Sequence, residues 1–248
     1  MDDESSAIAR MCAITISREY GSGGGEIAAR LAKRLKWQLI DHQVVVQVAQ
    51  KLRVSQKEAE EHDECVESLP SRILKSLRAI HPTMPVTVDI PFSMDARVFH
   101  EARSQIIEGA VASGHVVIVG RGAQAHLAQR KDVLHVRIIA PLEARIAYVM
   151  SREGLNRAAA QARTQQKDQE RSRYLETFYH RSPSDPHLYD LVLSTGVLDL
   201  DSAVDVISIV LERKARRLST PTQELGPAVG LPRYPSQPED FRPPPRNS

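Results

Sequence analysis

The stretch Ile14-Thr15-Ile16-Ser17-Arg18-Glu19-Tyr20-Gly21-Ser22-Gly23-Gly24-Gly25-Glu26-Ile27 decides the fold. An apolar, β-branched run from Met11 to Ile16 leads into it and is typical of a buried parallel strand. After the loop, Ile27, Leu31 and Leu35 recur at helical spacing. Four glycines within five residues let the backbone amides turn inward without Cβ clashes, and the following helix directs its positive end toward them. Strand, glycine loop and helix together predict a phosphate site.

The loop departs from the P-loop consensus G-x-x-x-x-G-K-[ST]. In that consensus the lysine reaches the β- and γ-phosphates and the hydroxyl holds magnesium. When Gly23 is aligned with the second consensus glycine, Gly24 takes the place of the lysine and Arg18 that of the first glycine. Both the lysine and the hydroxyl residue are missing. The loop alone therefore leaves two interpretations open: a phosphate site, or a glycine-rich turn that only joins a strand to a helix.

Five motifs follow one another along the chain. They are the string ISREYGSGGGEIAARLAKRL, the turn Gly120-Arg121-Gly122-Ala123, the helix start Ala140-Pro141-Leu142-Glu143-Ala144-Arg145, the group Lys167-Asp168 with Arg171 and Tyr174, and Tyr189-Asp190-Leu191. Together they resemble the cytidylate kinase-like family, relatives of the nucleoside monophosphate kinases, from about Cys12 to about Leu211. The resemblance implies an α/β P-loop three-layer fold with a five-stranded parallel sheet in the order 2-3-1-4-5, a helical acceptor-binding insert and an arginine-bearing lid.

Length and composition favour one domain. With 248 residues, 42% of them hydrophobic, the chain can bury one substantial core. The net charge of +2 lacks the usual signature of nucleic-acid binding. No apolar run approaches the length of a membrane span, and the acidic start lacks the apolar core of a signal peptide. Cys12 and Cys65 show neither metal-ligand nor disulfide spacing, so we expect a cytoplasmic protein without a metal site of its own.

The hydrophobic pattern predicts strands that alternate with helices, which is typical of a parallel sheet covered on both faces. The expected strands are 11–16, 37–40, 115–119, 133–139 and 189–195. We expect the kinase-like domain at 11–217, with a helical insert at 53–93 and a lid region at 152–180. Residues 1–10 are expected to be unstructured, as is the tail 218–248, which holds eight of the 15 prolines.

The candidate catalytic groups are mostly arginines. The donor phosphates are predicted to lie against the backbone of Gly21, Ser22, Gly23, Gly24, Gly25 and Glu26. By similarity to the family, Arg121, Arg145 and Arg171 clamp the donor and acceptor phosphates; an alternative for Arg121 is an ion pair that holds its turn. Arg18 is expected to replace the lost lysine because it lies within the loop. Asp168, three residues before Arg171, is expected to orient that arginine rather than act as a base.

The sequence also offers weaker candidates for the acceptor and for magnesium. Asp41 follows a short strand at the edge where open α/β sheets bind ligands, but an aspartate there is equally a helix N-cap. Arg72 lies on a basic segment of the insert, where most arginines are solvated. Mg²⁺ is expected to be held mainly by ATP and water, because the loop lacks the usual hydroxyl. Glu26 either contacts it through water or serves the helix dipole.

These features predict ATP-dependent phosphoryl transfer to a nucleoside monophosphate, with CMP or dCMP as the acceptor by resemblance. The transition state needs alignment and positive charge, which arginines supply. Two alternatives remain: a nucleotide-binding regulatory module without turnover, and a kinase for another small acceptor. The expected cofactors are ATP and Mg²⁺, and the expected ligands are small-molecule nucleotides. We expect no nucleic acid or membrane partner, and the proline-rich tail leaves a protein partner open.

Overall fold

The computed structural model describes residues 7–41, 96–221 and 224–225. Its centre is a parallel five-stranded sheet in the order β2-β3-β1-β4-β5. The strands are β1 (Ala13–Arg18), β2 (Gln38–Ile40), β3 (Val116–Val119), β4 (Val133–Ile139) and β5 (Leu191–Ser194). The predicted fold class and strand order are confirmed.

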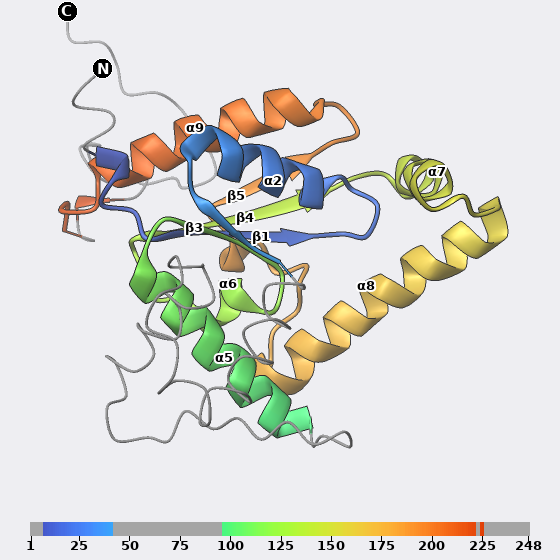
Figure 1. Ribbon diagram of the computed structural model, residues 1–248, viewed down its shortest axis with the longest axis horizontal. Coiled ribbons are helices and arrows are strands. Elements are labelled where there is room, and N and C mark those ends of the chain that lie inside the picture. The colour runs from blue at the N-terminus through green and yellow to red at the C-terminus, as the bar shows by residue number, and fades with distance from the viewer. Residues whose placement is uncertain (1–6, 42–95, 222–223, 226–248) are drawn as a thin grey trace, which may run out of the picture.

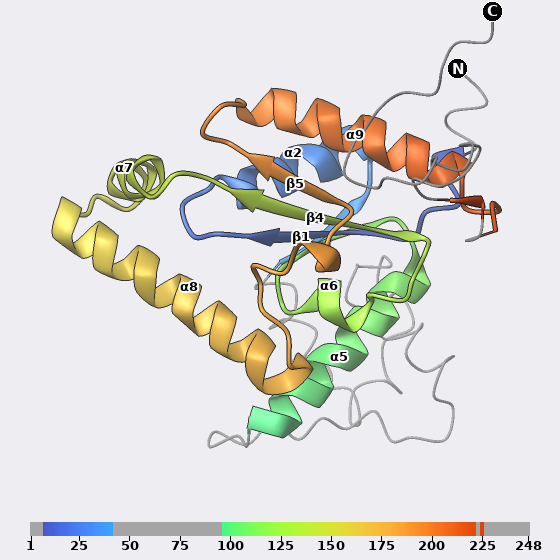
Figure 2. The same ribbon diagram turned by 180° about the vertical axis from the view of Figure 1, so that it is seen from behind.

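Helices cover both faces of this sheet (Figures 1 and 2). On one face lie α2 (Gly24–Leu35) and α9 (Leu200–Arg216). On the other side lie α5 (Ala96–Ser113), α6 (Ala123–His126) and α8 (Arg157–Tyr179). Helix α7 (Leu142–Glu153) follows β4 and leads into α8, and the 3₁₀ turn η1 (Pro186–Leu188) precedes β5. Among the described residues, no helix is both long and apolar enough to cross a bilayer.

The strands are apolar because both of their faces are covered. Ile14 and Ile16 of β1 are fully buried with the apolar residues of α2 and α9, whereas Ala13 belongs to the core against α5. The register pairs Ile14 with Val117 of β3. The same register places the carboxyl ends of β1, β3 and β4 at one edge, where the glycine loop begins.

Two of the predicted boundaries need correction. Residues 7–10, which we expected to be unstructured, form a short helical turn in which Ala7 is buried, and Arg10 Nη2 donates to the carbonyl of Ala215 at 3.0 Å. Leu218, expected in the unstructured tail, packs against the core. The apolar residues Ala7 and Leu218 explain both differences, because their packing extends the hydrophobic core beyond the expected domain boundaries at residues 11 and 217. The insert 53–93, residues 1–6 and the tail from 226 onward lie outside the described residues.

Candidate functional site

The glycine loop presents unpaired amides at the start of α2. Gly21 and Gly23 have φ angles of 80° and 76°, in the left-handed region that favours glycine. A Cβ at Gly21 would lie 2.7 Å from the carbonyl oxygen of Arg145. The first helical hydrogen bond runs from the Ile27 amide to the Gly23 carbonyl at 3.1 Å, so the amides before Ile27 have no partner within the helix. No side chain caps α2, which leaves these donors for an anion.

Arg18 occupies the space that a side chain at position 24 would need. A Cβ built on Gly24 would lie 2.7 Å from Arg18 Cβ. Farther along, a Cβ on Gly120 would lie 1.9 Å from Arg18 Nη1, so the guanidinium rests against the backbone of the turn after β3. Glycine is therefore needed at both positions to let Arg18 pass. That Arg18 stands in for the lysine stays a prediction.

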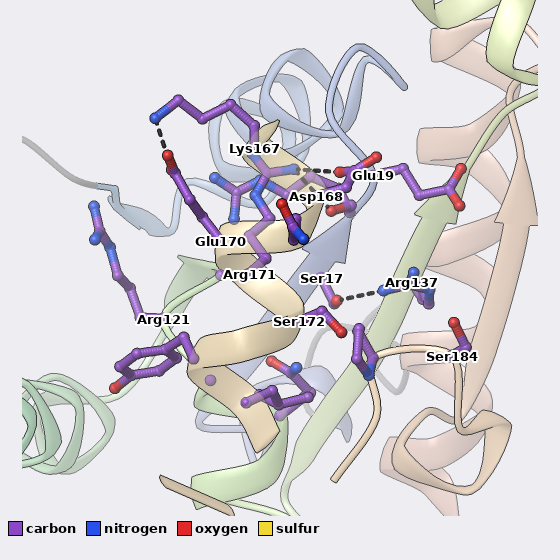
Figure 3. A pocket seen from close by; sticks show the side chains of 18 of the residues that line it. Ser17, Glu19, Arg121, Arg137, Lys167, Asp168, Glu170, Arg171, Ser172 and Ser184 are labelled. Carbon is purple, nitrogen blue, oxygen red and sulfur yellow. Dashed lines mark hydrogen bonds and ion pairs between the residues drawn. The ribbon is translucent and has the colours of Figure 1, made fainter. Parts of the chain in front are cut away.

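A cavity of about 810 Å³ opens between α8 and the carboxyl ends of β1 and β3 (Figure 3). Its basic side chains are Arg18, Arg103, Arg121, Arg137, Lys167 and Arg171. The acidic side chains in the lining are Glu19, Asp168 and Glu170. Because the cations outnumber the acids, the cavity has the charge expected of a site for an anionic ligand.

The guanidinium groups in this cavity compete with one another. Burial, followed by the charges of Arg171 and Arg121, lowers the pKa of Arg18 to about 9. Burial and the neighbouring charge of Arg103 lower the pKa of Arg121 to about 10. Burial also lowers the pKa of Arg171. Charged groups that are buried together in this way favour a bound anion, and perturbed pKa values of this kind are typical of functional sites.

Asp168 ties α8 to the glycine loop. Its Oδ1 accepts from the backbone amide of Tyr20 at 2.7 Å, and from Arg171 Nη1 at 3.4 Å. Its Oδ2 accepts from Arg145 Nη1 at 2.5 Å. Arg171 also donates to the carbonyl of Arg18 at 3.1 Å, and its guanidinium lies 5.3 Å from the centre of the Tyr20 ring. Asp168 thus contacts both Arg145 and Arg171, and its role in orienting Arg171 stays a prediction.

Arg145 lies behind the loop rather than in the cavity. The residue is 9% exposed and does not contribute to the cavity lining. It donates to the carbonyls of Ala140 at 3.1 Å and Tyr20 at 3.2 Å, and to Asp168. These hydrogen bonds hold Arg145 between the loop and α8, and the expected phosphate contact by Arg145 stays a prediction.

The structure brings together only some of the predicted site residues. Arg18, Arg121, Asp168 and Arg171 come together in the cavity. Residues 21–26 do not line it; Glu26 forms an ion pair with Arg152 at 2.9 Å. Asp41 directly follows β2 and does not line the cavity; its negative charge offsets part of the lowering that burial causes in the pKa of Arg121. Arg72 lies outside the described residues.

Sequence reasoning missed three basic residues of the lining: Arg103, Arg137 and Lys167. Lys167 belonged to a quoted motif but was not predicted to be in the site. Arg137 interrupts the apolar run of β4, and a charged residue within a strand that is buried on both faces is the signal that could have revealed it. Arg103 carries no such signal, since a basic residue on a helix is usually solvated.

The described residues do not provide a preformed cage for Mg²⁺. Among them, no group of three His, Cys, Asp or Glu side chains could hold a metal ion. Glu26, the acidic residue nearest the start of α2, has its carboxylate engaged by Arg152. This donor set fits a magnesium ion that arrives with a nucleotide and keeps phosphate oxygens and water as its ligands.

The chain is similar to several known proteins. The chain is 28% identical over 127 residues to a cytidylate kinase of Methanopyrus kandleri, which covers 50% of the chain and 63% of that enzyme. It is also 33% identical over 105 residues to a uronate isomerase of Corynebacterium glutamicum, which covers 42% of the chain and 20% of that enzyme. The chain thus spans less than two thirds of each of these relatives. An uncharacterised protein of Eubacterium ventriosum shares the fold, with a TM-score of 0.60, 22% identity, and coverage of 82% of the chain and 99% of that protein. The model of the cytidylate kinase-like family matches residues 13–197, and the chain belongs to that family.

Proposed function

We propose that this protein transfers a phosphoryl group from ATP to a nucleoside monophosphate, with CMP or dCMP as the acceptor. One observation carries the proposal: Arg18, Arg121 and Arg171 line one cavity beside the glycine loop, and burial lowers the pKa of each. Phosphoryl transfer needs positive charge around three equatorial oxygens and little covalent chemistry from the protein. Membership of the cytidylate kinase-like family supports a kinase reaction and, more narrowly, this acceptor class.

Each part of the site has a role in this reaction. The amides at the start of α2 bind the donor phosphates, and Arg18 reaches from the loop to the backbone of Gly120, where the donor and acceptor phosphates meet. Arg121 and Arg171 neutralise charge on the acceptor side. Mg²⁺ carried by the nucleotide neutralises charge on the donor phosphates. Helix α8, held to the loop by Asp168, excludes water from the transfer path.

Asp168 has no need to act as a base in this scheme. The second pKa of a phosphate monoester is about 6, so the attacking oxygen is already an anion at neutral pH. The carboxylate of Asp168 instead accepts hydrogen bonds from the Tyr20 amide and from two arginines. Asp168 contributes to the reaction by holding Arg171 in position.

A second function is favoured by one specific observation, the absence of a lysine at Gly24. A protein that binds nucleotide without turnover would need the loop amides and would not need that lysine. In this alternative the protein binds ATP and transfers nothing. A kinase for another small acceptor is the third candidate, and the arginine cluster supports it as well as it supports a nucleoside monophosphate kinase.

The test is a panel assay of purified protein with ATP, Mg²⁺ and each nucleoside monophosphate, with ADP formation as the readout. Arg121→Ala and Arg171→Ala are measured beside Arg30→Ala, a control whose exposed guanidinium pairs with Asp201 at 2.6 Å away from the cavity. Turnover with CMP or dCMP that both cavity variants lose and the control keeps supports the proposal. ATP binding without ADP formation for any monophosphate contradicts it and favours the second function.

A further inference from the structure

A buried arginine in the middle of β4 points to a subsite that the proposed roles do not use. Arg137 is 9% exposed, lines the cavity and lies opposite Ser17 in the pairing of β4 with β1 (Figure 3). Its Nη1 donates to Ser17 Oγ at 3.1 Å and to Tyr189 Oη at 3.4 Å. The guanidinium also lies 5.6 Å from the centre of the Tyr189 ring. Both hydrogen-bond partners are neutral hydroxyl groups.

No carboxylate among the described residues forms an ion pair with Arg137. A buried cation without an acidic partner destabilises the fold, because two neutral hydroxyls do not replace its hydration. Nη1 is used by Ser17 and Tyr189, which leaves Nε and Nη2 on a side chain that lines the cavity. Arg137 therefore has both a charge and donors to offer to a ligand.

The two hydroxyls beside Arg137 orient it and add no competing charge. Tyr189 Oη donates to the carbonyl of Pro183 at 2.9 Å, so its proton is already used. Ser17 Oγ lies 3.2 Å from Tyr189 Oη and can donate to it. Both oxygens then have lone pairs free to accept from Arg137, which fixes the guanidinium plane.

We propose that Arg137, oriented by Ser17 and Tyr189, forms an anion subsite that binds an oxyanion of the acceptor. The identification of this ligand as the acceptor rests on the proposed function, whereas the anion subsite itself does not. Arg137 and Arg171 line the same cavity, so a ligand bound there lies within reach of the arginine cluster. The acceptor is therefore an oxyanion such as a phosphate monoester or a carboxylate, and an uncharged nucleoside is excluded.

The subsite is tested by binding to the full chain without ATP. The probes are inorganic phosphate, CMP, cytidine and malonate, and the readouts are thermal unfolding and calorimetric affinity. Arg137→Met removes the charge at similar volume, Arg137→Lys keeps the charge without the planar fork, and Arg30→Ala is the matched control for loss of an arginine elsewhere.

We expect phosphate or CMP to raise the unfolding temperature of the wild type and cytidine to leave it unchanged. Arg137→Met should keep or raise the ligand-free unfolding temperature while weakening anion binding by about tenfold to a hundredfold. The anion affinity of Arg137→Lys should lie between those of the wild type and Arg137→Met, and Arg30→Ala should bind anions as tightly as the wild type. Arg137-dependent binding of malonate in place of phosphate would support the subsite and identify the oxyanion as a carboxylate.

Two results would overturn the inference. One is an Arg137→Met protein that unfolds at a lower temperature and binds CMP as tightly as the wild type, because Arg137 would then be structural. The other is a wild type that binds none of the anions. A wild type that binds CMP through Arg137 but forms no ADP supports the subsite and counts only against the proposed kinase reaction.

Discussion

A side chain at position 24 should be tolerated only when Arg18 is removed. A Cβ on Gly24 would lie 2.7 Å from Arg18 Cβ and 3.1 Å from Arg18 Cγ, whereas packed carbon atoms lie about 3.5–4.0 Å apart. Overpacking of this kind costs about 1–3 kcal/mol. Alanine regains up to about 1 kcal/mol of helix propensity relative to glycine. We therefore expect Gly24→Ala to lower the free energy of unfolding by about 1–2 kcal/mol, or the unfolding temperature by roughly 2–8 °C.

The assay is a double-mutant cycle by thermal and denaturant unfolding. It compares the wild type, Gly24→Ala, Arg18→Gly and the double variant, with Gly25→Ala as a control because a Cβ there meets nothing within 4 Å. Arg18→Gly removes the atoms that the introduced methyl group at position 24 would meet, so the two substitutions should couple favourably by at least about 1 kcal/mol. Arg18→Gly with Gly24→Lys restores the first glycine and the lysine of the consensus and should bind phosphate better than Gly24→Lys alone. Additive free energies in the cycle would refute the steric argument.

Three further perturbations follow from the same contacts. Gly21→Ala should lower the free energy of unfolding in urea by about 1–3 kcal/mol relative to Gly25→Ala. The reason is that the alanine Cβ at position 21 would lie 2.7 Å from a carbonyl oxygen, at a φ of 80°. Equal stabilities of the two variants would contradict this. Asp168→Asn weakens the hydrogen bonds between α8 and the loop, so it should lower the free energy of unfolding by about 1–3 kcal/mol. It should also lower kcat more than Arg30→Ala does. Unchanged stability and kcat would count against the positioning role. The pKa of Arg18 is lowered to about 9 in the fold. The charged guanidinium therefore lowers the free energy of unfolding of the ligand-free protein by its full amount below about pH 9, and by less as the pH rises above 9. The wild type should therefore gain stability relative to Arg18→Met as the pH rises above about 9, while its affinity for CMP falls. Calorimetry at each pH would show both changes, and a pH-independent difference would contradict the shift.

The sheet could be predicted because its strands depend on local sequence. Runs such as Val116–Val119 are apolar throughout, as strands buried on both faces must be. The start of the last strand was less predictable. The apolar pattern starts it at Tyr189, whereas β5 begins at Leu191. The Tyr189 hydroxyl accepts from Arg137, and Asp190 forms hydrogen bonds with His135 of β4 through both its amide and its carboxylate.

The site could be predicted only in part, because a side chain's direction depends on tertiary contacts. Arg18 and Arg121 adjoin glycines or the glycine loop at the ends of buried strands, where the topology itself brings them to the ligand edge. Arg145 lies in a family motif, yet its guanidinium points toward the Tyr20 and Ala140 carbonyls, which no periodicity reveals. Arg137 reaches the cavity because its strand register places it beside Ser17, and that register comes from the pairing of distant segments.

The most direct test of the central claim is transfer of the labelled γ-phosphate of ATP to CMP in a single turnover with excess enzyme. If the arginine cluster replaces the missing lysine, labelled CDP forms with the wild type and Arg30→Ala, and its rate falls by at least about a hundredfold in Arg18→Met, as loss of several kcal/mol of transition-state stabilisation requires. Labelled CDP at the same rate in Arg18→Met would contradict the account, and so would ATP binding by the wild type without labelled CDP.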